Sequence, residues 1–124
     1  MSIRHLSMQI KETFGEFLRK LREDQDLPIR KVAANLDIDS STLSKIERGE
    51  RSASKDLVKK AASFFNQNEQ SLMIRFLSDK VAYQIIDEES SEEILKVAEQ
   101  EIKYLKSKRF RQSELPLSDR NENN

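Results

Sequence analysis

Apolar side chains recur at steps of three and four residues along most of this 124-residue chain. The first series consists of Ile10, Phe14, Phe17, Leu18 and Leu21. Such spacing places the side chains on one face of an amphipathic helix. Glycine and proline, which favour turns and interrupt helices, occur only twice each. The sequence therefore predicts an all-α fold, because a sheet with many turns would need more of both residues.

Breaks between the apolar series divide the chain into helical segments. Pro28 suits the start of a second helix, because its missing amide hydrogen loses nothing there. Asp39 suits the N-cap of a third helix, and Gly49 suits a left-handed residue at its end. The expected organisation is a five-helix unit over residues 1–77, a helical segment over residues 78–110 and a flexible tail over residues 111–124.

Cysteine and histidine, which carry much nucleophilic and metal-binding chemistry, are scarce. The chain has no cysteine, which excludes disulfides, thiol catalysis and Cys-based zinc sites. It has one histidine, His5. The acidic pairs at residues 88–89 and 92–93 are typical of a solvated loop and helix start. No apolar run approaches the roughly 20 residues that span a membrane, and no signal peptide is visible. We expect a cytoplasmic protein that is not an enzyme, with no metal site, cofactor, small-molecule ligand or membrane contact.

The segment at residues 37–49 carries the most specific pattern. Leu43 and Ile46 lie three residues apart and are predicted to point inward. The residues predicted to point outward are small or basic, and they are Ser40, Ser41, Ser44, Lys45 and Arg48. Small side chains let a helix enter the DNA major groove, serine bonds to several bases, and lysine prefers guanine. The alternative is that the serines only cap the helix.

Residues 14–65 resemble the helix-turn-helix family of Cro and phage repressors. The most specific part is the sequence LSKIERGER at residues 43–51, and the resemblance covers roughly the first 77 residues. The other matching residues are Leu21, Arg22, Leu27, Val32, Ala33, Leu36, Ile38 and Leu57. The resemblance implies a five-helix, phage-repressor-like domain, to which this chain adds a C-terminal helix.

The family implies a role for each short helix. Its second helix lies across the DNA backbone, and its third, the recognition helix, enters the major groove of double-stranded DNA. We expect the recognition helix at about residues 40–47, with Lys45 on a base. The DNA-binding residues that the resemblance implies are Arg30, Ser40, Ser41, Thr42, Ser44, Lys45, Arg48, Arg51, Ser52 and Lys55. It also implies a structural salt bridge inside the domain between Arg22 and Glu47.

Two positions depart from the family pattern. Many members carry a polar residue where this chain has Ile29, so that DNA contact is absent or becomes apolar here. Many members carry glycine in the turn where this chain has Asp37. Aspartate tolerates a left-handed backbone better than most residues, so the turn is expected to persist.

One helix-turn-helix contacts only a few base pairs, and dimers gain specificity by binding two half-sites. We expect a homodimeric transcriptional regulator, a Cro-like repressor, on an inverted-repeat operator. The residues expected in the dimer interface are Leu72, Phe76, Val81, Ile85, Leu95, Ala98, Ile102 and Leu105. The alternative is that the last helix folds back on its own subunit. Small family members with an appended helix resemble the controller proteins of restriction–modification systems; phage-type repressors and antitoxin-like autoregulators remain open.

Overall charge does not favour a nucleic-acid partner, because the chain carries 22 basic and 22 acidic residues. Residues 1–60 hold 13 basic and 10 acidic residues, whereas residues 61–124 hold 9 and 12. The acidic second half could contact a basic protein. A helix-turn-helix module that binds a protein partner instead of DNA is therefore the alternative function.

Overall fold

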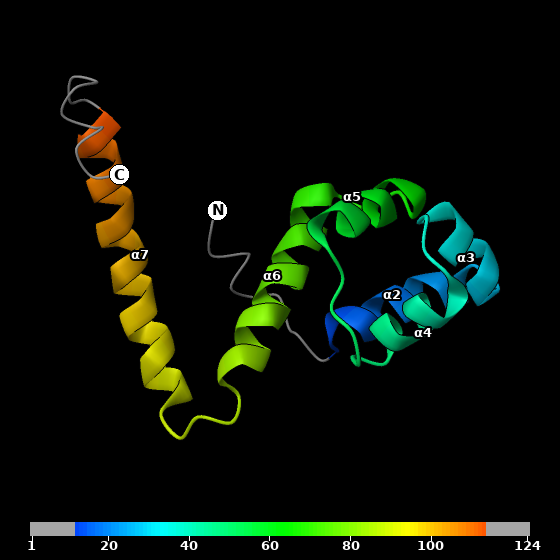
Figure 1. The fold of residues 1–124 in the computed structure, drawn as a ribbon, viewed down its shortest axis with the longest axis horizontal. Coiled ribbons are helices and arrows are strands. Elements are labelled where there is room, and N and C mark those ends of the chain that lie inside the picture. The colour runs from blue at the N-terminus through cyan, green and yellow to red at the C-terminus, as the bar shows by residue number, and fades with distance from the viewer. Residues whose placement is uncertain (1–11, 114–124) are drawn as a thin grey trace. The chain divides into compact units, whose positions relative to one another are not determined.

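A computed structural model describes residues 12–113, and every regular element in this part of the chain is an α-helix (Figure 1). The helices are α2 (Phe14–Asp24), α3 (Ile29–Asn35), α4 (Ser40–Glu47), α5 (Lys55–Phe64), α6 (Glu69–Ile85) and α7 (Ser91–Ser113). The chain divides into two compact units, which we call the first unit (Met1–Ala82) and the second unit (Tyr83–Asn124). The prediction of an all-α fold with an additional C-terminal helix is confirmed.

Some predictions concern residues outside the described range. His5 and Ile10 precede it, and most of the tail predicted over residues 111–124 follows it. Residues 111–113 lie inside the range and belong to α7.

Helix α2 begins with a reciprocal pair of hydrogen bonds. Thr13 Oγ1 accepts the backbone N–H of Glu16 at 3.1 Å, and Glu16 Oε1 accepts the backbone N–H of Thr13 at 2.8 Å. This capping box gives partners to amides that have none within the helix. With the start fixed in this way, Phe14 and Leu18 both fall on the buried face of α2.

The helices α2 to α5 all end in the same motif. Each has a residue with a left-handed backbone just beyond its end; these are Asp26, Asp37, Gly49 and Asn66, with φ angles of 53°, 63°, 76° and 53°. The next residue donates its N–H to the carbonyl five residues back, as Glu50 does to Lys45 at 2.8 Å. The motif pairs carbonyl groups that helix ends leave without partners. The left-handed backbone predicted for Asp37 and Gly49 is confirmed.

Helices α2 to α6 enclose one hydrophobic core in the first unit. Its largest fully buried side chains are Leu18, Val32, Leu36, Leu43, Val58 and Leu72. Each of the five helices contributes at least one of them. Burial of a side chain of this size stabilises the fold by about 1.5–3 kcal/mol, so no helix of the first unit is dispensable.

Helix α2 approaches α4 unusually closely at Gly15. A Cβ atom built on Gly15 would lie 2.2 Å from the carbonyl oxygen of Ile46 and 2.8 Å from that of Glu47. Both oxygens belong to the backbone at the end of α4, so neither can move aside as a flexible side chain would. Gly15 therefore permits direct packing of the α2 backbone against the last turn of α4.

The first half of α6 belongs to the core. Leu72 and Phe76 are each only 2 % exposed, and the Phe76 ring meets the Phe14 ring edge-on at 5.3 Å. Asp79, one turn further on, accepts the backbone N–H of Phe14 at 3.1 Å. Leu72 and Phe76 are therefore core residues and not, as the sequence analysis expects, part of a dimer face. The periodicity was ambiguous because a core face and an interface face of one helix have the same spacing.

The second unit leaves most of its large apolar side chains exposed. The large apolar side chains of α7 from Ile94 to Leu105 are between 38 % and 56 % exposed. Ala98 and Ile85 are half-buried. Val81, near the end of the first unit, is exposed. None of the described helices has the length and apolar character needed to cross a membrane.

Candidate nucleic-acid interface

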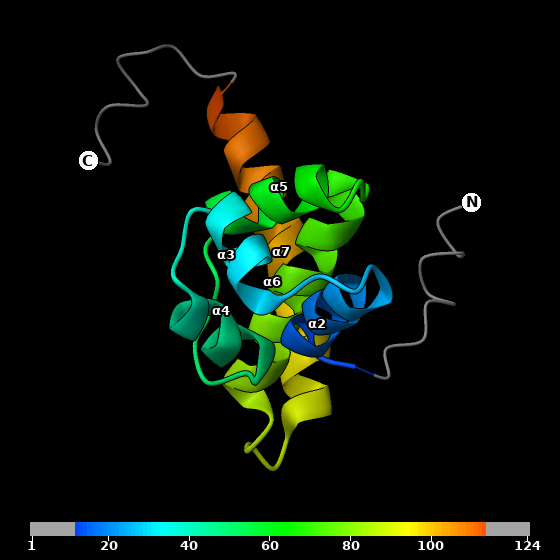
Figure 2. The ribbon, with the colours of Figure 1, turned by 90° about the vertical axis from the view of Figure 1, so that its right-hand side faces the viewer.

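The candidate interface is built on α4, which packs against α2 and α3 and follows α3 after a short connection (Figure 2). Leu43 and Ile46 lie on its inner side and are 1 % and 4 % exposed. The helix spans Ser40–Glu47, which are the bounds expected for the recognition helix. Burial of the inner side fixes which residues α4 presents outward.

Asp39 holds the beginning of α4. Its carboxylate accepts the backbone N–H of Thr42 at 2.7 Å and the hydroxyl of Ser41 at 2.9 Å. These hydrogen bonds, chiefly the one from the Thr42 backbone, lower the pKa of Asp39 below its ordinary value. Ser41 therefore contributes to the cap, as the alternative interpretation of the serines expects, and its oxygen can still accept a hydrogen bond.

Lys45 is the basic side chain that α4 itself presents outward. It is exposed, and no carboxylate among residues 12–113 forms an ion pair with its ammonium group. Its charge does help to lower the pKa of Glu50, after the larger effects of Arg48. Ser40 and Ser44 are half-buried beside it. This face therefore combines small hydroxyl groups with one extended cation.

Arg48 follows α4 and is already engaged. Its Nε lies 2.7 Å from Glu50 Oε2, and its Nη1 donates to the hydroxyl oxygen of Ser44. The hydrogen bond between Arg48 and Glu50 raises the pKa of Arg48 and lowers that of Glu50. Both side chains are about half exposed, at 50 % and 54 %, and such surface pairs contribute little to stability. The Arg48 guanidinium can therefore exchange its partner at small cost.

Further polar residues surround α4. Arg51, Ser52 and Lys55 follow it and are exposed, and the charge of Arg51 contributes to the lowered pKa of Asp39. Arg30 is exposed near the start of α3. Ile29, which stands where many family members carry a polar residue, is partly buried and packs against the core.

Arg22 and Glu47 form the predicted ion pair inside the first unit. Arg22 Nε and Nη2 donate to the two Glu47 oxygens at 2.8 and 3.0 Å, and Nη1 donates to the Leu27 carbonyl at 3.0 Å. The hydrogen bonds to Glu47 raise the pKa of Arg22, against the opposing effect of burial. Glu47 is only 6 % exposed. The pair therefore joins the end of α2 to the end of α4 and is unavailable to DNA.

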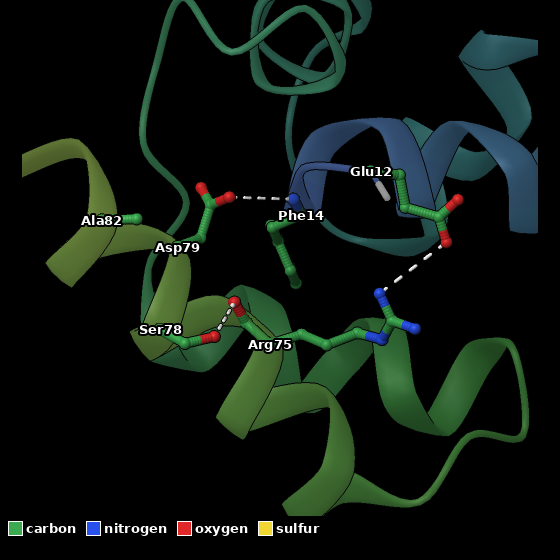
Figure 3. Close-up of a pocket in the computed structure, with 6 residues that line it drawn as sticks. All are labelled: Glu12, Phe14, Arg75, Ser78, Asp79 and Ala82. Atoms are coloured by element: carbon green, nitrogen blue, oxygen red, sulfur yellow. Dashed lines mark hydrogen bonds and ion pairs between the residues drawn. The ribbon is translucent and has the colours of Figure 1, made fainter. Parts of the chain in front are cut away.

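A pocket of about 270 Å³ lies within the first unit, against α2 and α6 (Figure 3). Its polar groups already have partners: Asp79 accepts the N–H of Phe14, Arg75 lies 3.7 Å from Glu12, and Ser78 donates to the Arg75 carbonyl. A polar ligand would have to displace these contacts. No cluster of His, Cys, Asp and Glu suited to a metal ion occurs among the described residues.

The sequence analysis did not identify Gly15 or Asp79, which position α2. Gly15 lies within a predicted helix, and a glycine in such a place is a signal for close packing that the sequence did contain. Asp79 gives no such signal, because its partner is a backbone amide 65 residues away.

Comparison with known proteins agrees with this geometry. Residues 18–72 match a family model described as helix-turn-helix. The match contains all of α3, α4 and α5, most of α2 and the start of α6. No curated protein and no solved structure matches the chain. The outward face of α4 lies inside the matched region, and the second unit lies outside it.

Proposed function

Residues 18–72 are a helix-turn-helix domain of the Cro and phage-repressor family, and from this premise we propose that the chain is a sequence-specific regulator of transcription that binds DNA through α4. The single observation that carries the proposal is the outward face of α4. Small hydroxyl side chains flank the exposed cation Lys45 there, while the opposite face is buried. A helix of this composition suits the major groove, where Lys45 bonds to guanine and serine to several bases.

Phosphate contacts complete the proposed interface. Arg51, Ser52 and Lys55 follow α4, and Arg30 lies at the start of α3, all with exposed side chains. Arg48 exchanges Glu50 for a phosphate oxygen, because an exposed ion pair gives up little when it is replaced. Such contacts fix the position of the protein on the duplex, whereas Lys45 and the α4 hydroxyl groups select the sequence.

The proposed regulator binds an inverted repeat as a homodimer. Two half-sites multiply the specificity of a short recognition helix, and most soluble homo-oligomers are two-fold dimers. Residues of the predicted interface that stay on the surface support this part of the proposal. They are Val81, Leu95, Ile102 and Leu105, which are exposed, and Ile85 and Ala98, which are half-buried.

Selection of binding sites from random duplex DNA tests the proposal. The purified full chain is used at near-physiological salt, and its mass in solution is measured in the same buffer. We expect enrichment of an inverted repeat with half-site centres about 10 base pairs apart. Failure of the folded protein to enrich any sequence would contradict sequence-specific binding.

Three variants then locate the interface. Lys45→Ala should change the preferred base at one position and cost about 1–3 kcal/mol there. Arg51→Ala should weaken binding evenly across sequences. Lys20→Ala is the matched control, because Lys20 is an exposed lysine of α2 outside the predicted set. Full binding by both interface variants would show that another face meets DNA.

The second candidate function is a protein-interaction module, which the exposed apolar side chains of the second unit favour. Salt separates the two functions. DNA binding through several phosphates weakens steeply as salt rises, because binding releases condensed counterions. Binding to an apolar protein surface does not show this dependence.

A further inference from the structure

One face of α7 carries an apolar row that nothing in the described second unit buries. Leu95, Ala98, Ile102 and Leu105 follow one another at steps of three, four and three, the spacing of a two-helix seam. Leu95, Ile102 and Leu105 are 48 %, 52 % and 42 % exposed. Helices in proteins owe most of their stability to packing of the apolar face. The row therefore requires a partner surface.

The charges of α7 are divided between its two halves. Residues 91–101 contain four acidic residues and one basic residue, whereas residues 102–113 contain five basic residues and no acidic residue. The helix dipole favours such a division only within the first and last turns. Glu99, Glu101 and Lys103 lie in the middle of this 23-residue helix, where the dipole does not explain them. The division therefore points to a partner with the opposite order of charges.

We propose that the partner of α7 is α7 of a second copy, packed antiparallel to it. In this orientation the acidic half of each helix faces the basic half of the other, and the two apolar rows meet. A parallel pair would place like-charged halves side by side. The proposal deepens the proposed function, on which it rests for the presence of two copies, by naming the surface that joins them.

The spacing of the row fixes how the two helices align. The intervals between the four apolar residues are three, four and three, and they are the same when counted from either end of the helix. The row therefore matches its own copy when the two helices run antiparallel. Leu95 then faces Leu105 of the second copy, and Ala98 faces Ile102, a small side chain against a large one. In this alignment Glu92 approaches Lys106 of the second copy, whereas Glu99 and Glu101 each lie near their own counterparts. In a parallel pair Glu101 would instead approach Lys106 of the second copy.

Disulfide cross-linking tests the orientation, since the chain has no cysteine of its own. Leu95→Cys and Leu105→Cys are made separately in the full-length chain, one with a tag of different mass, and oxidised mildly without DNA. A disulfide requires the two Cα atoms within about 7 Å. We expect a covalent dimer of the two variants when they are mixed, and no covalent dimer from either alone. Ser107→Cys is the control, because Ser107 lies opposite the apolar row and should give no product.

Three outcomes would overturn the proposal. Cross-linking of each variant with itself would show a parallel pair. Absence of product from a protein that remains dimeric by mass would place the interface elsewhere. A monomeric wild-type chain would show that no second copy covers the row, and would favour the alternative in which the last helix folds back on its own subunit. The cross-linking reaction contains no DNA, so its result does not depend on whether the chain binds DNA. Conversely, the chain can bind an inverted repeat even if the two α7 helices do not cross-link.

Glu101→Gln gives an independent measurement that leaves the apolar row intact. In the antiparallel pair it removes a like-charge contact and should tighten the dimer about twofold, as seen by sedimentation. In a parallel pair it removes an attraction and should weaken the dimer by a similar factor. The sign of the change therefore decides the orientation.

Discussion

In the first unit Val58 and Ala61 are fully buried, whereas in the second unit Ile102 and Tyr104 are more than half exposed. The first unit buries its apolar residues among five helices and closes four of them with the same left-handed motif. The second unit has one long amphipathic helix whose apolar row has no cover within the described residues. The comparison indicates that the first unit is stable by itself, whereas the second depends on association.

The largest expected effect is on the ion pair inside the first unit. Glu47→Ala should lower the free energy of unfolding by about 3–5 kcal/mol, because it leaves the Arg22 guanidinium without its partner. Denaturant unfolding followed by circular dichroism measures the change. Glu50→Ala, which removes an exposed carboxylate, should have no measurable effect. Equal stability of the two variants would refute a structural role for the pair.

The same truncation in both units tests the comparison directly. Leu18→Ala should destabilise the first unit by about 2–5 kcal/mol, because it leaves a cavity in the core. Leu105→Ala should leave the first unit unchanged and weaken only self-association. Amide hydrogen exchange in α2 and α5 reports on the first unit alone. Faster exchange there in Leu105→Ala would show that the two units are not independent.

The close approach of α2 to α4 gives the next effect. Gly15→Ala should cost about 1–3 kcal/mol or more, since the added Cβ meets two backbone carbonyl oxygens. Thermal unfolding measures it. Lys20→Ala, on the exposed side of the same helix, is the control. Unchanged stability of Gly15→Ala would mean that the two helices can separate freely.

The turn between α3 and α4 tests the left-handed motif. Asp37→Val should cost about 1–2 kcal/mol, because a β-branched residue is strained at a φ of 63°. Asp37→Gly removes the backbone strain but gives the unfolded chain more conformational freedom. The two effects oppose each other, so this variant should be close to the natural chain in stability. Equal destabilisation by both variants would point to the Asp37 side chain instead of the backbone.

The smallest effect concerns the cap of α4 and depends on pH. The pKa of Asp39 is lowered in the folded state, so its charge stabilises the fold above its unfolded pKa of about 4. This contribution is lost as pH falls through the lower, folded pKa. Asp39→Asn keeps a hydrogen-bonding cap but has no charge. Unfolding curves of the two proteins should differ at pH 7 and converge below pH 4; a constant difference would exclude the charge as its cause.

The sequence was most informative where structure is local. The limits of α4 follow from Asp39 and Gly49, and each depends on residues within one turn. The left-handed backbone at Asp37 was expected from the family resemblance, because many members carry glycine at this turn position. The Arg22–Glu47 pair came from the family resemblance, since no local rule connects positions 25 residues apart.

Contacts between distant segments were harder to predict. The apolar series of α6 is continuous, yet Phe76 lies in the core while Val81 lies on the surface. Periodicity identifies a helical face and cannot say what covers it. The division of charge along α7 was present in the sequence, but its meaning emerged only when α7 proved to be one unbroken helix.

The Arg22–Glu47 pair has a consequence for DNA recognition, although neither residue touches DNA in the proposed interface. Glu47 ends α4, and its two hydrogen bonds to Arg22 hold that end in a single orientation. Lys45 is two residues away, so the direction in which it leaves the helix is set before any duplex arrives. The backbone that carries Lys45 therefore needs no reordering in the proposed interface, and this preorganisation favours affinity. A variant that loosens the pair and still folds should show a relaxed sequence preference in addition to its lower stability.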